Sequence, residues 1–381
     1  MPCTRCGAEL ATSAHYCHAC GHQVGGGLVP YAVKPNESVA SLRLVSTIMP
    51  FGATKGPSTY RWALGIAAAA TLVAAVLGAL PIAVLLAALA IPIVYVVYLY
   101  DVNQWEDEPV LVTGVAFVLT AVLAAGWTAA WLALRGPSPS TVGDGSAAPV
   151  PSVASMLVPV LLAPLVGEVI RQVAPIVLAS RDKFDDLMDG LTFGVIAGVS
   201  YATADTLVKH WALLSAGFPG TADAGTWTSL LLLEGFVKPL VMGTASGLAG
   251  AEFSGLGRGH DGITPRYLLR VVEAIAANAL FVLGVQVLLR WPGGVLGFVL
   301  SSVWGLAILA YLLIRLRRAL QLGLTEAALE SVARRRGVGE GELSHCEACE
   351  MPLLPDAAFC GACGKSLRAT AKTGANQEVT R

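Results

Sequence analysis

Long apolar stretches recur between residues 60 and 315, and short polar segments separate them. Each stretch is about as long as the roughly 20 mostly apolar residues that a helix needs to cross a bilayer. The pattern predicts eight membrane-spanning helices, at residues 60–80, 81–100, 109–134, 153–179, 187–215, 227–252, 267–290 and 294–315. The predicted fold is mainly α: a polytopic membrane helix bundle of about eight spans with a small module at each end.

The composition agrees with a membrane protein. Of the 381 residues, 55% are hydrophobic and 13% are charged, whereas soluble domains carry about 25% charged residues. The mean hydropathy is +0.66. These values exclude an ordinary soluble enzyme and a disordered chain. The net charge of -1 gives no strong signal for a nucleic-acid partner, because such proteins neutralise phosphates with many Lys and Arg side chains.

The cysteines lie outside the apolar region, in two groups of four with the same spacing, C-x2-C-x10-C-x2-C. The groups are Cys3, Cys6, Cys17 and Cys20 near the start, and Cys346, Cys349, Cys360 and Cys363 near the end. Two CxxC knuckles turn four thiolates toward one tetrahedral zinc ion, and such a closed site is structural. The pattern therefore predicts two structural zinc ions. In the alternative, a histidine replaces one cysteine as ligand, the candidates being His15, His18, His22 and His345.

The two cysteine segments, CTRCGAELATSAHYCHACGHQV and CEACEMPLLPDAAFCGACGKSL, are similar to each other. Both resemble the short zinc-ribbon module that is often fused to bacterial membrane proteins. Glycine follows the second cysteine of three knuckles, at Gly7, Gly21 and Gly364, where the turn favours a positive φ. Glu350 stands at the fourth.

Two independent arguments predict the topology. Zinc-binding thiolates indicate the reducing cytosol, so both ends are expected there and the number of spans is even. The Lys and Arg residues agree, because inner segments of membrane proteins are enriched in them. The predicted inner segments hold Arg181, Lys183, Arg258, Arg266, Arg270 and the arginines of the C-terminal tail, whereas the predicted outer loops hold Arg135 and Arg290. We therefore predict a multi-pass protein of the cell membrane with both termini cytoplasmic.

Composition shifts also predict domain boundaries. They are an N-terminal zinc ribbon at 1–24, a linker at 25–59, a membrane helical domain at 60–316, a basic juxtamembrane helix or linker at 317–343, a C-terminal zinc ribbon at 344–368 and a disordered tail at 369–381. Within the juxtamembrane segment, residues 325–336 predict a surface helix with Thr325 as its N-cap.

Three predicted spans each carry an acid and a base on one helix face. The pairs are Glu168 with Arg171, Asp205 with Lys209, and Glu234 with Lys238, and residues three or four apart on a helix are neighbours. Charges inside a membrane are costly and tend to mark function. Two interpretations remain open: each pair neutralises itself so that the helix inserts, or the acids belong to a site.

The region from about Tyr98 to Asn278 resembles the PrsW-type intramembrane metalloprotease family. The similar segments are YLYDVNQWEDEP, VGEVIRQ, RDKFDDLMDGLTFGVIAGVSYATADT, KPLVMGTASGLAG and EAIAANAL. The resemblance implies that Glu168 and Asp205 occupy the positions of catalytic acids. The motif's first glutamate is Gly167 here, its lysine is Arg171, and the second-motif glutamate is Asp205.

The resemblance also implies histidine in the later helices, and none stands there. His210 is the one histidine within the eight predicted spans. Carboxylates without histidine make a poor zinc site, because they suit harder ions. A catalytic site could draw only on Glu168, Asp205, and His210 or Glu273, so we expect it to be degraded.

Three hypotheses follow. In the first, the chain is a PrsW-like protein of the lipid bilayer with a degraded active site. It binds or regulates membrane or cytosolic proteins, and its zinc ribbons recruit these partners. In the second, it is an active intramembrane metalloprotease that uses Glu168 and Asp205. In the third, it is an ion- or proton-coupled transporter that uses the buried acid–base pairs.

Overall fold

A computed structural model gives the structure of the chain. It describes residues 2–11, 14–24, 59–79, 110–135, 153–181, 183–184, 186–215, 230–257, 259–291, 294–339 and 343–367, with isolated residues between 82 and 97. These residues form two compact units. The first, here called the ribbon unit, falls within Met1–Ala53, Leu256–Arg258 and Leu320–Arg381. The second, here called the bundle, falls within Thr54–Gly255 and Gly259–Ala319.

The described residues are mainly helical, as the apolar pattern predicts. The helices are α2 (Thr59–Val76), α4 (Val110–Arg135), α5 (Val153–Ala179), α6 (Leu187–Lys209), α7 (Trp211–Leu214), the π-helix η1 (Leu230–Val237), α9 (Lys238–Ser254), α10 (Pro265–Arg290) and α11 (Gly294–Arg335). Six of the helical segments in this part of the chain are long and apolar enough to cross a membrane. They correspond to the last six predicted spans, and α2 corresponds to the first. The second, at 81–100, lies largely outside the described residues.

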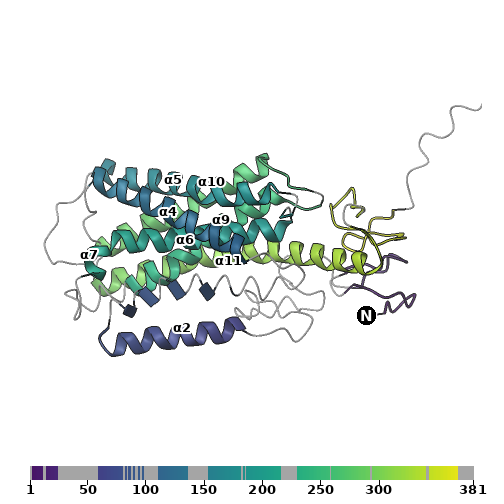
Figure 1. The fold of residues 1–381 in the computed structure, drawn as a ribbon, viewed down its shortest axis with the longest axis horizontal. Coiled ribbons are helices and arrows are strands. Elements are labelled where there is room, and N and C mark those ends of the chain that lie inside the picture. The colour runs from purple at the N-terminus through teal and green to yellow at the C-terminus, as the bar shows by residue number, and fades with distance from the viewer. Residues whose placement is uncertain are drawn as a thin grey trace, which may run out of the picture. The chain divides into compact units, whose positions relative to one another are not determined.

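Helices α6 and α9 form the centre of the bundle, and α4, α5 and α10 pack around them (Figure 1). Glycines allow the two backbones to approach closely. A Cβ atom on Gly190 or Gly194 of α6 would collide with a carbonyl oxygen of α9, and one on Gly198 would lie 2.5 Å from the Cα of Gly243. Small residues at four-residue spacing are the usual basis of close helix packing in membranes, where lipid weakens the hydrophobic drive for association.

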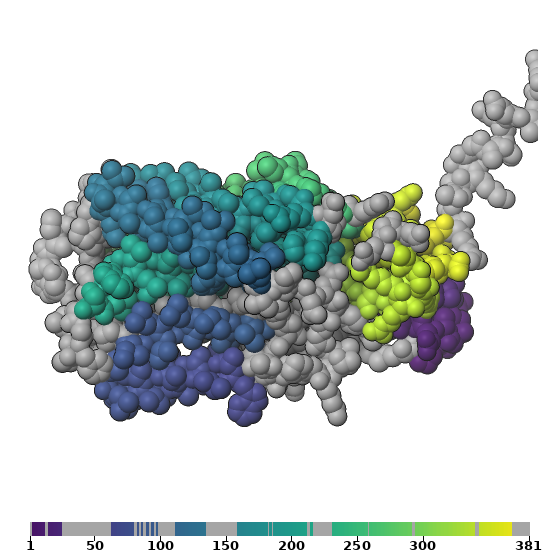
Figure 2. Space-filling view, in the orientation of Figure 1, coloured from purple at the N-terminus to yellow at the C-terminus, as the bar shows by residue number. Residues whose placement is uncertain are grey.

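The helices at the periphery have the opposite character. Helix α4, on the face turned to the viewer in Figure 2, exposes Leu111, Val115, Val118 and Val122, whereas α6 is buried over nearly its whole length. The inner pair α6 and η1–α9 carries more small and polar residues than α4. An apolar exterior around a more polar interior fits a bundle whose solvent is lipid.

The ribbon unit is built from short turns and the C-terminal part of α11. Among its described residues, β pairing is limited to isolated bridges, which join Pro2 to Glu9 and Tyr16 to Gln23 in the first ribbon. The second ribbon has the same two bridges, between His345 and Pro352 and between Phe359 and Ser366. Leu329 of α11 lies in a shared apolar cluster with residues of both ribbons.

Helix α11 differs from its prediction. It runs without a break for 42 residues, so residues 325–336 continue the last predicted span and do not start a new helix. Thr325 is buried, and its hydroxyl donates to the carbonyl of Gln321 at 2.7 Å. A threonine hydroxyl that bonds one turn back sits inside a helix, so the prediction of an N-cap at Thr325 was wrong. The linker at 25–59, apart from its last residue, and the tail at 369–381 lie outside the described residues.

Candidate functional site

Each ribbon brings its four cysteines together. In the first, the Sγ atoms of Cys3 and Cys20 lie 3.8 Å apart and those of Cys6 and Cys17 lie 3.6 Å apart. None of the eight cysteines forms a disulfide bond. In a tetrahedral site with Zn–S bonds of about 2.3 Å, the sulfur atoms stand about 3.8 Å apart. The donor set therefore fits a metal ion with four-thiolate coordination.

The second ribbon repeats this geometry. The Sγ atoms of Cys346 and Cys363 lie 3.8 Å apart, and those of Cys349 and Cys360 lie 3.6 Å apart. In both ribbons the ligand atoms of all four cysteines fall within 4.8 Å of one another, and no histidine of the described residues joins either group. The burial of His15 lowers the pKa of its ring, which favours the neutral imidazole.

The knuckle backbones explain the glycine pattern. The residue after the second cysteine of each CxxC has a positive φ: 73° at Gly7, 67° at Gly21, 61° at Glu350 and 75° at Gly364. Its backbone N–H donates to the carbonyl of the first cysteine, at 2.8–3.0 Å in all four knuckles. Glu350 adopts the same left-handed conformation as the three glycines, which costs an L side chain about 1–2 kcal/mol.

Hydrogen bonds favour the thiolate form of one cysteine in each ribbon, Cys3 and Cys360. The N–H groups of Arg5 and Cys6 point at the Cys3 sulfur and lower the pKa of that thiol. In the second ribbon, the side chain of Cys349 hydrogen-bonds to the Cys360 sulfur and lowers its pKa. Metals bind the deprotonated sulfur, so these donors prepare the ribbons for a cation.

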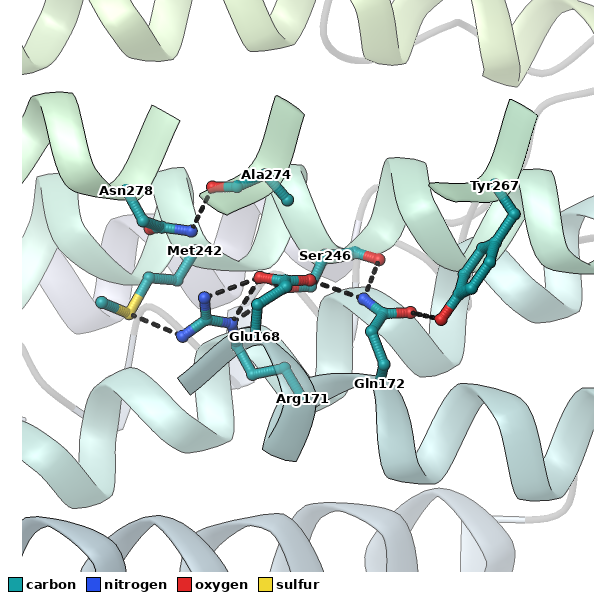
Figure 3. A network of polar contacts seen from close by, with 8 residues as sticks. All are labelled: Glu168, Arg171, Gln172, Met242, Ser246, Tyr267, Ala274 and Asn278. Carbon is teal, nitrogen blue, oxygen red and sulfur yellow. Dashed lines mark hydrogen bonds and ion pairs between the residues drawn. The ribbon is translucent and has the colours of Figure 1, made fainter. Parts of the chain in front are cut away.

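In the bundle, by contrast, the buried acids are paired with side chains of the same chain. Glu168 on α5 is fully buried, and both of its carboxylate oxygens have protein partners (Figure 3). Oε2 lies 2.6 Å from Nη2 and 3.1 Å from Nε of Arg171 and accepts from the Ser246 hydroxyl at 3.1 Å. Oε1 accepts from Nε2 of Gln172 at 2.6 Å. A forked Arg contact plus two neutral donors occupies most of the lone pairs of a carboxylate.

The same network extends to α10, α6 and α9. The Tyr267 hydroxyl of α10 donates to Gln172 at 3.3 Å. Arg171 stacks on the ring of Tyr201, with its guanidinium carbon 4.8 Å from the ring centre, and its Nη1 lies 3.8 Å from the sulfur of Met242. Four helices therefore hold the Glu168–Arg171 ion pair in the interior of the bundle.

The structure shows what surrounds Gly167, the position that the PrsW resemblance gives to a first glutamate. Gly167 is next to Glu168 on α5, and a Cβ there would lie 2.9 Å from the Tyr201 hydroxyl and 3.1 Å from Nη1 of Arg171. Cβ atoms essentially never lie as close as 2.9 Å to another heavy atom, so a side chain at residue 167 would displace the Tyr201 hydroxyl. The space of a second glutamate is taken by Tyr201 and Arg171.

A second ionic network surrounds Asp205 of α6. Its carboxylate accepts from Lys209 at 2.7 Å, from Lys238 at 2.7 Å and from the Thr128 hydroxyl of α4 at 2.7 Å. Lys238 also forms an ion pair with Glu234. Lys238 thus bridges two acids from different helices, Asp205 of α6 and Glu234 of η1.

Two residues of this bridge lie at the junction of a π-helix and an α-helix. Glu234 lies within η1, and Lys238 is the first residue of the α-helix that follows. π-helical turns are rare and frequently occur at functional sites. Thr206 completes the group: its hydroxyl donates to Glu234 at 3.1 Å, and Lys238 Nζ lies 3.0 Å from the same hydroxyl. Lys238 has 4% of its side chain exposed, whereas Lys209 has 37%.

A third group lies around Glu273 of α10. Glu273 accepts from Arg270 at 2.6 Å, from Arg315 at 3.3 Å and from the Tyr311 hydroxyl at 2.6 Å. Arg270 also contacts Glu252 of α9 at 3.0 Å. Glu273 is therefore occupied by side chains of α10 and α11, separately from Glu168 and Asp205.

The other candidate residues make local backbone contacts. His210 caps the C-terminus of α6, where its backbone N–H donates to the carbonyl of Thr206. Asn278 donates through Nδ2 to the carbonyl of Ala274 at 2.8 Å. Apart from the two cysteine groups, no three His, Cys, Asp or Glu ligand atoms converge within the part of the chain that the structure describes. The sequence motifs gave no indication of the Lys238 bridge, because its partners belong to different helices.

No family model, curated protein or solved structure matches the chain. The resemblance to PrsW-type proteases rests on the motifs alone. The start of the similar region, YLYDVNQWEDEP, lies outside the described residues.

Proposed function

We propose that this chain is a non-catalytic membrane protein that binds other membrane proteins through its helical bundle and regulates them. In this proposal its ancestry is PrsW-like, its eight spans place both termini in the cytosol of a cell-membrane protein, and each ribbon holds one structural zinc ion. The two ribbons recruit cytosolic protein partners. The residues that would hold zinc are the eight cysteines of the two four-thiolate groups.

One observation carries the proposal: the two candidate catalytic acids are neutralised by cations of the same chain. Arg171 holds Glu168, and Lys209 and Lys238 hold Asp205. A hydrolytic metal site needs ligands that face the ion and a position for water. A carboxylate already paired with a buried cation gains little by exchanging it for a metal, since the cation would then be left without a partner.

The test compares wild type with Glu168→Gln. Both are purified as full-length protein, placed in lipid vesicles and mixed with labelled single-span membrane proteins. The substitution keeps side-chain volume and hydrogen bonding and removes the charge. We expect no cleavage by either protein and cross-linking of the same single-span proteins by both. Cleavage by wild type that Glu168→Gln abolishes, with fold and yield intact, would show that Glu168 is the catalytic base.

The topology has its own test. A reporter that is active only outside the cell, fused after Arg381, should give no signal, because the zinc thiolates and the Lys and Arg bias both indicate the cytosol. A strong signal would overturn the even number of spans.

A proton-coupled transporter is the second candidate, and the Asp205–Lys238–Glu234 bridge favours it. Buried ionisable residues of membrane helices form proton relays in pumps and transporters, and here Glu234 lies within a π-helix that Lys238 directly follows. Proton uptake by vesicles that contain the wild-type protein, lost on Glu234→Gln, would support this role over the first.

A further inference from the structure

The two ribbons are docked on each other within the ribbon unit, and the contacts come in equivalent pairs. The backbone N–H groups of His15 and Tyr16 both donate to the carbonyl of Gly361, at 2.9 and 2.8 Å. In return, the N–H groups of Ala358 and Phe359 both donate to the carbonyl of His18, at 2.9 and 3.0 Å.

These residues occupy the same positions of the repeat. Tyr16 and Phe359 each precede the third cysteine of their ribbon, and His18 and Gly361 each follow it. An interface in which each partner uses the same patch is the geometry of a two-fold symmetric dimer. The ribbons therefore behave as two halves of a symmetric pair that one chain carries at its opposite ends.

The aromatic contacts follow the same symmetry. The ring of Tyr16 lies against Gly364, where an added Cβ would come within 2.8 Å of the ring. The ring of Phe359 lies against Gly21 with the same separation. Each ring thus covers the positive-φ glycine of the partner knuckle, and only a residue without a side chain leaves room for it.

The interface also touches the metal ligands. His18 and Gly361 are the residues next to Cys17 and Cys360, so the cross-ribbon hydrogen bonds fix the backbone on both sides of the third ligand. The apolar cluster around Leu329 includes Ala14 of the first ribbon, and Cys346 and Cys360 of the second. Small metal modules have little core and obtain their folding energy from the ion, so an unfolded ribbon removes half of this interface.

We propose that the two ribbons are one cooperative metal-binding unit, in which each loaded ribbon holds the other in its metal-binding conformation. Loss of the metal at one end of the chain then loosens the metal at the other. This inference rests on the proposed zinc assignment and does not depend on the role proposed for the bundle. The paired ribbons also pack together on the C-terminal part of α11, through the apolar cluster around Leu329.

The test is site-resolved alkylation of the full-length, zinc-loaded protein in detergent. A chelator and N-ethylmaleimide are added together, and peptide mass spectrometry follows the modification of each cysteine, which reacts only after the metal has left. Cys17→Ser, which removes a ligand of the first ribbon, should accelerate modification of the Cys346–Cys363 group by at least about tenfold. Cys360→Ser should have the reciprocal effect on the first ribbon.

A docking variant separates coupling from ligand loss. Tyr16→Ala with Phe359→Ala keeps all eight thiols and removes both rings, and it should accelerate release at both sites. Glu9→Gln, which changes an exposed side chain of the first ribbon outside its knuckles, is the control and should match wild type. Unchanged release from the second ribbon in Cys17→Ser would overturn the coupling. A wild-type content clearly below about two zinc per chain would instead refute the zinc assignment, and the inference with it.

Discussion

The ribbons and the bundle both bury polar side chains, but they arrange them in opposite ways. In each ribbon, four sulfur atoms of the same kind face one another at 3.6–3.8 Å between paired atoms. In the bundle, the buried acids Glu168 and Asp205 face cations of the same chain, as Glu168 faces Arg171 at 2.6 Å. Four converging thiolates can hold an added cation, whereas the charge of an acid that meets lysine or arginine is already balanced within the chain.

The difference separates the region that can hold a metal ion from the region whose acids are paired within the chain. Sequence motifs alone give both regions the appearance of metal sites, because both contain ligand-type residues at suggestive spacing. The surroundings separate them: the backbone amides near Cys3 and Cys360 favour anionic sulfur, while Lys238 holds Asp205 and Glu234 together from within.

Removing a ribbon ligand should give the largest effect. Cys17→Ser should unfold the first ribbon, because a structural zinc ion supplies about 10–16 kcal/mol in small modules. The zinc content should fall by at least one ion per chain while the protein stays in the membrane fraction. Full retention of zinc would show that the four-thiolate group is not the site.

The second-largest effect should come from removing Lys238, the cation that Asp205 and Glu234 share. Lys238→Met leaves Asp205 and Glu234 side by side without that charge and should destabilise the bundle by about 3–5 kcal/mol, by analogy with buried pairs in soluble proteins. Denaturation in detergent and membrane yield measure the loss. Lys209→Met is the matched control: its side chain is more than a third exposed, so we expect about 0–1 kcal/mol. Equal effects would contradict the central role of Lys238.

Filling the position of the missing glutamate should have a smaller effect. Gly167→Ala places a Cβ against Tyr201 and should destabilise the bundle by about 1–3 kcal/mol through overpacking. Gly126→Ala on α4 has open space among the described residues, so the better helix propensity of alanine should make it neutral or slightly stabilising. The melting temperatures of both variants and wild type, measured in the same detergent, test this prediction. A stabilising Gly167→Ala would mean that the pocket beside Glu168 is not filled.

The smallest predicted effect concerns a single backbone angle. Glu350→Gly should stabilise the second ribbon by about 1 kcal/mol, because glycine adopts a φ near 61° without steric cost. Gly7→Ala at the equivalent knuckle has free space but the same backbone conformation, and it should weaken the first ribbon by a similar amount. The rate of zinc release to a chelator measures both. Changes of the opposite sign would contradict the positive φ that the two knuckles share.

The coarse architecture follows from sequence because its signals are local. Apolar length predicts the helices, and α5 begins and ends where the pattern places it, at Val153–Ala179. Cysteine spacing predicts the two clusters. By contrast, α11 continues through residues 316–335, since that segment contains no proline and Leu329 packs in the ribbon unit.

The contacts between distant segments could not be predicted in this way. The pairing of Lys238 with Asp205, 33 positions earlier, depends on how α6 meets η1 and α9. The docking of Tyr16 against Gly364 joins the two ends of the chain, and a single sequence shows only that the ribbons are similar. The occupation of the Gly167 position by Tyr201 likewise appears only in three dimensions.

Metal analysis of two purified proteins tests the central claim most directly, that the metal sites are the ribbons and that the bundle acids serve folding. Wild type should contain about two zinc ions per chain, one for each closed four-thiolate site. A variant with all eight cysteines replaced by serine should contain none, with the bundle still in the membrane. An ion that remains in this variant and disappears on Glu168→Gln would contradict the account, because Glu168 would then be a metal ligand.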